Sequence, residues 1–158
     1  MTSRELFIKT AMGEQKAFAG VVKAVPQKKW DHQPDPKTRT AKSLAYQLAL
    51  QPRVMANLVK TKKVEMKEVK LNSVAAMVKE LNAGFAELKK VVSKIDDKAW
   101  ETTPVVMKFT GGEWKDTLDM MSWGFLLDMI HHRGQLSTYL RSMGGKVPAI
   151  YGPSGDSK

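Results

Sequence analysis

Apolar residues recur three or four positions apart in four separate stretches of this chain, and this spacing constrains the fold more than any other feature. Such a stripe covers one side of a helix, and it has to be buried against other helices. The stretches are residues 3–24, 40–58, 73–96 and 113–143. They predict an all-α fold, a four-helix bundle that forms a single domain over residues 1–158.

Long connections are expected after the first and second helices. Residues 26–37 contain three prolines, and residues 60–70 contain five lysines and two glutamates, so both are predicted to be loops. Pro52 lies inside the second helical pattern and predicts a kink or a break just before it. Ser3 is the expected N-cap of the first helix. Residues 104–112 are expected to form a short extended segment that ends in a turn. The last helix is expected to start near Glu113, to carry Trp114 and to be interrupted near its beginning.

Composition excludes several classes of protein. The chain has no cysteine, which rules out disulfides, cysteine-ligated zinc, iron–sulfur clusters and a thiol nucleophile of its own. No apolar run approaches the length of a membrane span, and the first residues lack the apolar core of a signal peptide. We therefore expect no membrane partner and a cytoplasmic location.

The most promising chemistry lies in the last helix. Asp128 and His132 are four residues apart, so their side chains stack on one face and could chelate a divalent cation together with a third ligand from another helix. An ordinary hydrogen bond between the two is the competing interpretation. His131 is turned about 100° away and cannot share the same ion from that face.

The stretch from Asp128 to Arg141, with its His-Arg-Gly-Gln string at 132–135, resembles the last helix of the DinB-like family. The similarity extends to the first helix, the Trp- and Pro-rich loop and the second helix. It implies a four-helix bundle, a homodimer, and a metal site built from three histidines. His132 matches one of these ligands and Asp128 replaces another. The third falls at Leu50 or Gln51, of which Gln51 is the candidate ligand.

A set of carboxylate, imidazole and amide oxygen would hold zinc, nickel or manganese weakly, or no metal. The resemblance then implies a metal-dependent hydrolase or thiol transferase that acts on a small molecule, with His131 and Tyr151 near the substrate. The alternative is a metal-free bundle that binds a small molecule or serves a structural purpose. The sequence does not decide whether the protein is an enzyme, and it identifies no catalytic residue.

The formal net charge of +10 raises a third hypothesis, a binder of polyanions. The densest basic run, residues 60–70, has no arginine, no interleaved aromatic residue and two glutamates. It therefore lacks the groups that read or stack on bases. A solvated lysine face is the better interpretation, and nucleic-acid binding is not expected.

Overall fold

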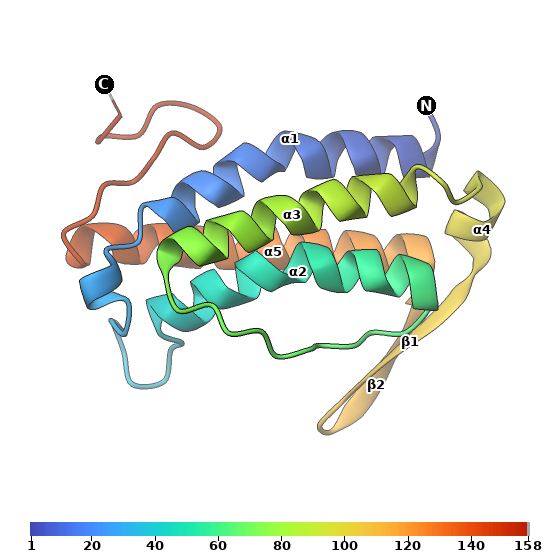
Figure 1. The fold of residues 1–158 in the computed structure, drawn as a ribbon, viewed down its shortest axis with the longest axis horizontal. Coiled ribbons are helices and arrows are strands. Elements are labelled where there is room, and N and C mark those ends of the chain that lie inside the picture. The colour runs from blue at the N-terminus through green and yellow to red at the C-terminus, as the bar shows by residue number, and fades with distance from the viewer. Residues whose placement is uncertain (158) are drawn as a thin grey trace.

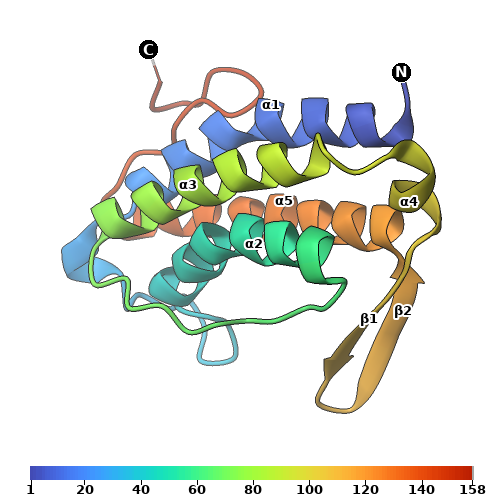
Figure 2. The same cartoon turned by 45° about the vertical axis from the view of Figure 1, so that its right-hand side comes forward.

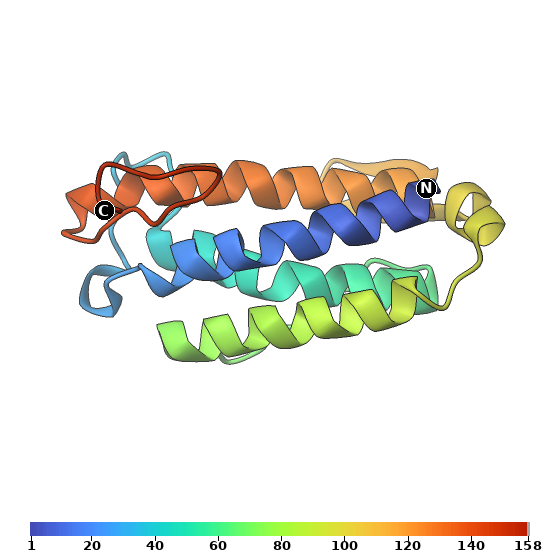
Figure 3. The same cartoon turned by 90° about the horizontal axis from the view of Figure 1, so that it is seen from above.

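The computed structural model describes residues 1–157, and most of them are helical. Four long helices lie side by side (Figure 1, Figure 3). They are α1 (Ser3–Lys23), α2 (Ala41–Thr61), α3 (Val74–Val92) and α5 (Leu118–Ser142). The remaining elements are the 3-10 turn η1 (Gln27–Lys29), the short helix α4 (Asp97–Thr102) and the antiparallel strands β1 (Pro104–Phe109) and β2 (Gly112–Thr117). The helical prediction is confirmed in the main, but the chain is not purely α.

Each long helix begins after a residue whose hydroxyl accepts a hydrogen bond from the first helical turn. These residues are Thr2, Thr40, Ser73 and Thr117. A hydroxyl at this position satisfies a backbone N–H that has no partner inside the helix. The prediction of Ser3 as the cap of α1 is wrong by one residue, because Thr2 and Glu5 form a reciprocal capping box.

The first strand of the β-hairpin and its turn lie where an extended segment was expected, whereas the second strand is the main departure from the prediction. Residues expected to open the last helix instead form β2, and Trp114 pairs with Met107 of β1. The indole of Trp114 lies over Gly124 of α5, where there is no side chain to displace it. This packing and the ladder hold residues 112–117 extended, so α5 begins only at Leu118. The hairpin projects from one end of the helices (Figure 2).

The segment between α3 and the hairpin also differs from the prediction. The third helical stretch was expected to run to residue 96, whereas α3 ends at Val92 and Asp96 caps the separate helix α4. The Asp96 carboxylate accepts a hydrogen bond from the Ala99 backbone N–H at 2.8 Å. An aspartate at a helix start is favoured by the helix dipole, which explains why a helix begins after Asp96.

Of the two outcomes predicted for Pro52, a break does not occur, because α2 continues from Ala41 to Thr61. The proline is buried against Gly84 of α3. A Cβ atom at Gly84 would lie 3.1 Å from Pro52 Cβ and 3.0 Å from the Arg53 backbone nitrogen. This close approach lets α3 pack over the turn in which the proline lacks a backbone N–H, so packing between helices outweighs the local cost of the proline.

The buried residues form one cluster between the four long helices. Its largest fully buried side chains include Trp100, Phe7, Phe18 and Phe85. The connection between α2 and α3 runs as an extended segment along α2 (Figure 1). Tyr46 of α2 fastens this segment, because its hydroxyl donates to the Val69 carbonyl at 2.9 Å and accepts from the Val69 N–H at 3.0 Å.

The C-terminal residues return across α1 and α5 (Figure 3). Pro148 lies against Gly20 of α1. Asp156 accepts hydrogen bonds from the Val147 backbone N–H at 2.9 Å and from Arg141 Nε at 3.0 Å. Among the helices of residues 1–157, none combines the length and the hydropathy that a membrane crossing requires.

Candidate functional site

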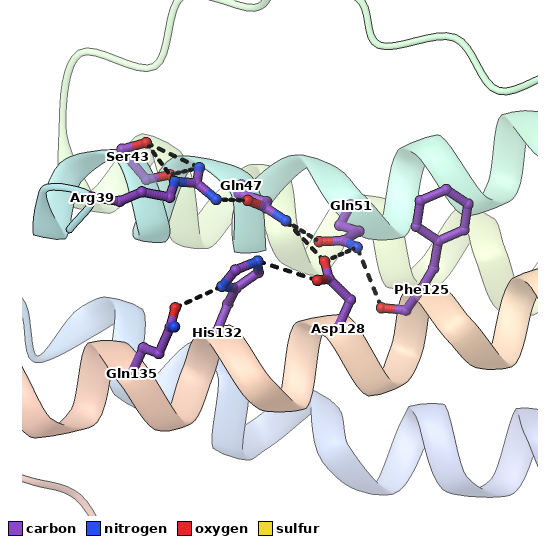
Figure 4. A network of polar contacts seen from close by, with 8 residues as sticks. All are labelled: Arg39, Ser43, Gln47, Gln51, Phe125, Asp128, His132 and Gln135. Carbon is purple, nitrogen blue, oxygen red and sulfur yellow. Dashed lines mark hydrogen bonds and ion pairs between the residues drawn. The ribbon is translucent and has the colours of Figure 1, made fainter. Parts of the chain in front are cut away.

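Asp128 and His132 lie on the face of α5 that is turned toward α2 (Figure 4). His132 Nε2 is 3.2 Å from Asp128 Oδ1, as their helical spacing predicts. The imidazole is 14% exposed and the carboxylate 42%. The pair therefore lies at the edge of the core. Leu127, the residue before Asp128, is 60% exposed and lies outside this contact.

Two glutamine amides on α2 face the carboxylate. Gln51 Nε2 donates to Asp128 Oδ2 at 2.8 Å and to the Phe125 carbonyl at 3.3 Å. Gln47 Nε2, one turn earlier, donates to the same oxygen at 2.9 Å and lies 3.3 Å from Gln51 Oε1. Of the two candidates at the second-helix position, Gln51 is thus the one that faces Asp128. Leu50 points into a different cavity, beside residues 65–69.

The polar network continues beyond these residues at both ends (Figure 4). The Arg39 guanidinium donates to Gln47 Oε1 and orients that amide so that its nitrogen faces Asp128. At the other end, His132 Nδ1 is 2.8 Å from Gln135 Oε1. Both nitrogens of the His132 ring therefore face oxygen atoms, and the imidazole donates to both only in its doubly protonated form.

This arrangement does not fit a metal ion. Gln51 presents its nitrogen to Asp128, because only the nitrogen can donate to both Asp128 Oδ2 and the Phe125 carbonyl. An amide nitrogen that donates in this way is not a ligand, and the two nearest ligating groups, Asp128 and His132, already contact each other. Within residues 1–157, no cluster of three or more His, Cys, Asp or Glu side chains is arranged to hold an ion.

The two remaining candidate residues lie outside the network. His131 is exposed, with its ring centroid 5.2 Å from that of His132. The Tyr151 hydroxyl bonds to Arg133 Nη2 at 2.6 Å and to Glu14 Oε2 at 3.0 Å, between α1 and α5. The structure therefore does not bring Tyr151 into contact with Asp128 or His132. A substrate-binding role for His131 or for Tyr151 stays a prediction.

Arg133 forms a second polar cluster on the α1 side of α5. The residue is 2% exposed, and its guanidinium pairs with Glu14 and lies 4.7 Å from the centroid of the Phe18 ring. The aromatic ring of Tyr151 covers it from the tail, at 5.0 Å. A cation between a carboxylate and two aromatic faces can remain charged while buried. Arg133 thus ties together α1, α5 and the C-terminal tail.

A comparison of the chain with models of known protein families shows which family has this architecture. The model of the DinB family matches residues 1–157. The chain belongs to the DinB family. No relative was found among curated proteins.

Two solved structures resemble this DinB-family chain. A DinB-like protein from Bacillus subtilis superimposes with a TM-score of 0.70 at 13% identity, covering 94% of this chain and 99% of that one. A DinB-like protein from Bacillus cereus does so with a TM-score of 0.72 at 18% identity, covering 93% and 97%. At these identities the likeness concerns the fold alone.

Sequence reasoning missed Gln47 and assigned no contact to Gln135. Gln47 precedes Gln51 by four residues, and Gln135 follows His132 by three, so each lies on the same helical face as a residue already singled out. This spacing is the feature of the sequence that could have identified Gln47 and Gln135. The pairing of α2 with α5 could not be read from it, because it depends on how the helices pack.

Proposed function

We propose that this DinB-family chain is a homodimeric four-helix bundle that binds a small molecule without a metal, and that Asp128 serves as a polar link between α2 and α5. The observation that carries this proposal is the direction of the two amides: Gln47 and Gln51 both donate to Asp128 Oδ2. A carboxylate so engaged is compensated by hydrogen bonds. It does not need a cation to offset its charge.

The metal-dependent alternative uses the same residues. In it, Asp128, His132 and the Gln51 amide oxygen hold zinc, nickel or manganese weakly, and the protein is a hydrolase or a thiol transferase. For this, the Gln51 amide has to reverse and give up its hydrogen bonds to Asp128 and the Phe125 carbonyl. The metal would have to offset that loss, so we favour the metal-independent function.

Metal analysis distinguishes the two. Protein purified without an affinity tag is assayed for bound metal, and its thermal unfolding is followed with added Zn²⁺, Ni²⁺ or Mn²⁺. We expect far less than one equivalent of metal, and no rise in Tm beyond that of Asp128→Ala, because a ligand raises Tm only by binding the folded state. One equivalent of metal, or a rise in Tm that Asp128→Ala abolishes, would establish the metal-dependent alternative.

A gain-of-function pair checks the geometry of the proposal. Gln51→His adds an imidazole facing Asp128 and His132, so this variant should acquire Zn²⁺ or Ni²⁺ binding that the wild type lacks. Leu50→His is the matched control. It should acquire none, because position 50 lines a different cavity. Equal behaviour of the two variants would contradict the placement of Gln51.

The homodimer rests on the outer face of α5. Met120 and Leu127 are 55% and 60% exposed and seven residues apart, so they lie on one face of the helix. Leu127→Glu should convert a dimer to a monomer in light scattering, because it places a charge in an apolar contact. Met66→Glu changes a residue that is 73% exposed outside this face, and it should leave the dimer intact. A monomeric wild type would refute the dimer.

A further inference from the structure

A cavity of about 230 Å³ lies between α2 and the extended segment that follows it, away from the Asp128 network. Leu50, Val54 and Ala56 of α2 and Val69 of the segment supply its apolar wall. A cavity of this volume has room for a small organic ligand. The Tyr46 hydroxyl fixes the segment through Val69, so this side of the cavity is preformed.

Most of the charges around the cavity already have partners. Arg53 pairs with Glu80, and this hydrogen bond raises the pKa of Arg53. Lys60 pairs with Glu87. The hydrogen bond from Lys60 lowers the pKa of the Glu87 carboxyl, which therefore stays ionised and bound to Lys60. These four side chains balance one another and leave no net charge for a ligand.

Two lining charges of opposite sign have no such partner. Glu65 and Lys67 are exposed at the rim of the cavity, and their side chains form no hydrogen bond or ion pair within residues 1–157. They lie two positions apart, and Val69 lies two further on, which is the spacing that puts extended side chains on one face. The amide of Asn57 adds a neutral polar group from α2.

We propose that this cavity binds an α-amino acid with an apolar side chain. The ammonium group would meet Glu65, the carboxylate would meet Lys67, and the side chain would lie on Leu50, Val54 and Val69. A zwitterion carries one group to pair with the Glu65 carboxylate and one to pair with the Lys67 ammonium. A ligand with a single charge leaves one of these two side chains without a partner. This inference names a ligand for the small-molecule function proposed above, but it uses none of the residues around Asp128.

The test is a titration of the full chain with L-leucine, followed by ¹H–¹⁵N NMR and calorimetry. Two analogues each lack one charge: 4-methylpentanoate has no ammonium group, and 3-methylbutylamine has no carboxylate. We expect saturable shifts at residues 50–57 and 65–69 with leucine. Each analogue should bind about tenfold more weakly, as the loss of one charge-assisted hydrogen bond predicts.

Matched variants assign the two charges. Glu65→Gln should abolish the preference for leucine over 4-methylpentanoate, and Lys67→Met the preference over 3-methylbutylamine. Glu68→Gln and Lys70→Met change the same charges in the same segment at positions that do not line the cavity, and both should bind as the wild type does. Val54→Phe, with its fold checked by circular dichroism, should fill the cavity and remove binding.

Three results would overturn the inference: no saturable shift with leucine, analogues that bind as tightly as leucine, or equal losses in the control variants. None of them bears on the metal-independence of the Asp128 network, because the variants leave that network untouched. Conversely, a metal bound at Asp128 would refute the proposed network and leave this cavity unaffected.

Discussion

Arg133 and His132 are consecutive residues of α5, yet their side chains serve different contacts. His132 faces α2 and joins the glutamine network, whereas Arg133 faces α1 and is buried against Glu14 and Phe18. Neighbouring helical residues point about 100° apart, which is why one turn of helix reaches two partner helices. The His-Arg-Gly-Gln string thus contacts α1 directly through Arg133 and is connected to α2 through Asp128.

The buried ion pair of Arg133 and Glu14 leads to a prediction about the stability of a single-residue variant. Glu14→Gln should destabilise the protein by about 2 kcal/mol, because Arg133 would keep its charge without a compensating carboxylate. This is below the range for fully buried pairs, since Glu14 is 14% exposed and glutamine retains an acceptor.

Urea denaturation measures this change. The control is Glu113→Gln, which breaks the exposed pair with Lys115 and should shift stability by less than about 0.5 kcal/mol. If Glu14→Gln cost no more than this control, the Arg133 cluster would not be a source of stability.

Among the elements, the β-hairpin packs on α5 at Gly124, where the lack of a side chain makes room for Trp114. A Cβ atom at Gly124 would lie 2.9 Å from Trp114 Cζ2 and closer still to Cη2. Trp114 also packs beside Phe125, with 6.1 Å between the ring centroids. The position of β2 on α5 therefore depends on the absence of a side chain at residue 124.

Gly124→Ala should displace the Trp114 ring and destabilise the fold by roughly 1–3 kcal/mol, the usual cost of overpacking. Gly134→Ala is the matched control in the same helix. No neighbouring atom lies within 4 Å of the place that a Cβ atom would occupy there, so alanine should stabilise the helix by about 0.5–1 kcal/mol. Tryptophan fluorescence and thermal unfolding report both effects. Equal changes of the same sign would contradict the packing of Trp114 on α5.

At the scale of the whole molecule, two aspartates fasten peripheral segments to the helices. Arg4 donates a hydrogen bond to Asp97 and lowers the pKa of its carboxyl, with Thr2 contributing a further hydrogen bond. The Val147 backbone N–H, with Arg141, lowers the pKa of Asp156 in the tail. One carboxylate thus connects α1 to α4, and the other closes the C-terminal tail.

These lowered pKa values predict a loss of stability in acid. Each carboxylate contributes its stability fully above the unfolded value of 3.8, and loses it as the pH falls through the lower folded value. Asp97→Asn and Asp156→Asn should each reduce the dependence of the unfolding free energy on pH below about 4. Denaturation at a series of acidic pH values measures this. A wild-type slope retained in both variants would exclude these carboxylates as its source.

The four long helices and the Asp128–His132 face can be read from the sequence, because a period of 3.6 residues and an i, i+4 spacing are local properties of the chain. The strand β2, the course of α2 past Pro52 and the contacts of Asp128 depend on packing between elements that are distant in the chain. Because Trp114 packs on Gly124, residues that were predicted to begin the last helix form the strand β2. Because Gly84 has no side chain, α3 packs closely on Pro52 and α2 continues through it. The amides that face Asp128 lie 77 and 81 positions away in the chain: the family resemblance offered Gln51 as one of two candidates, whereas Gln47 was not expected. Such contacts depend on how helices pack against one another, and no local pattern encodes that packing.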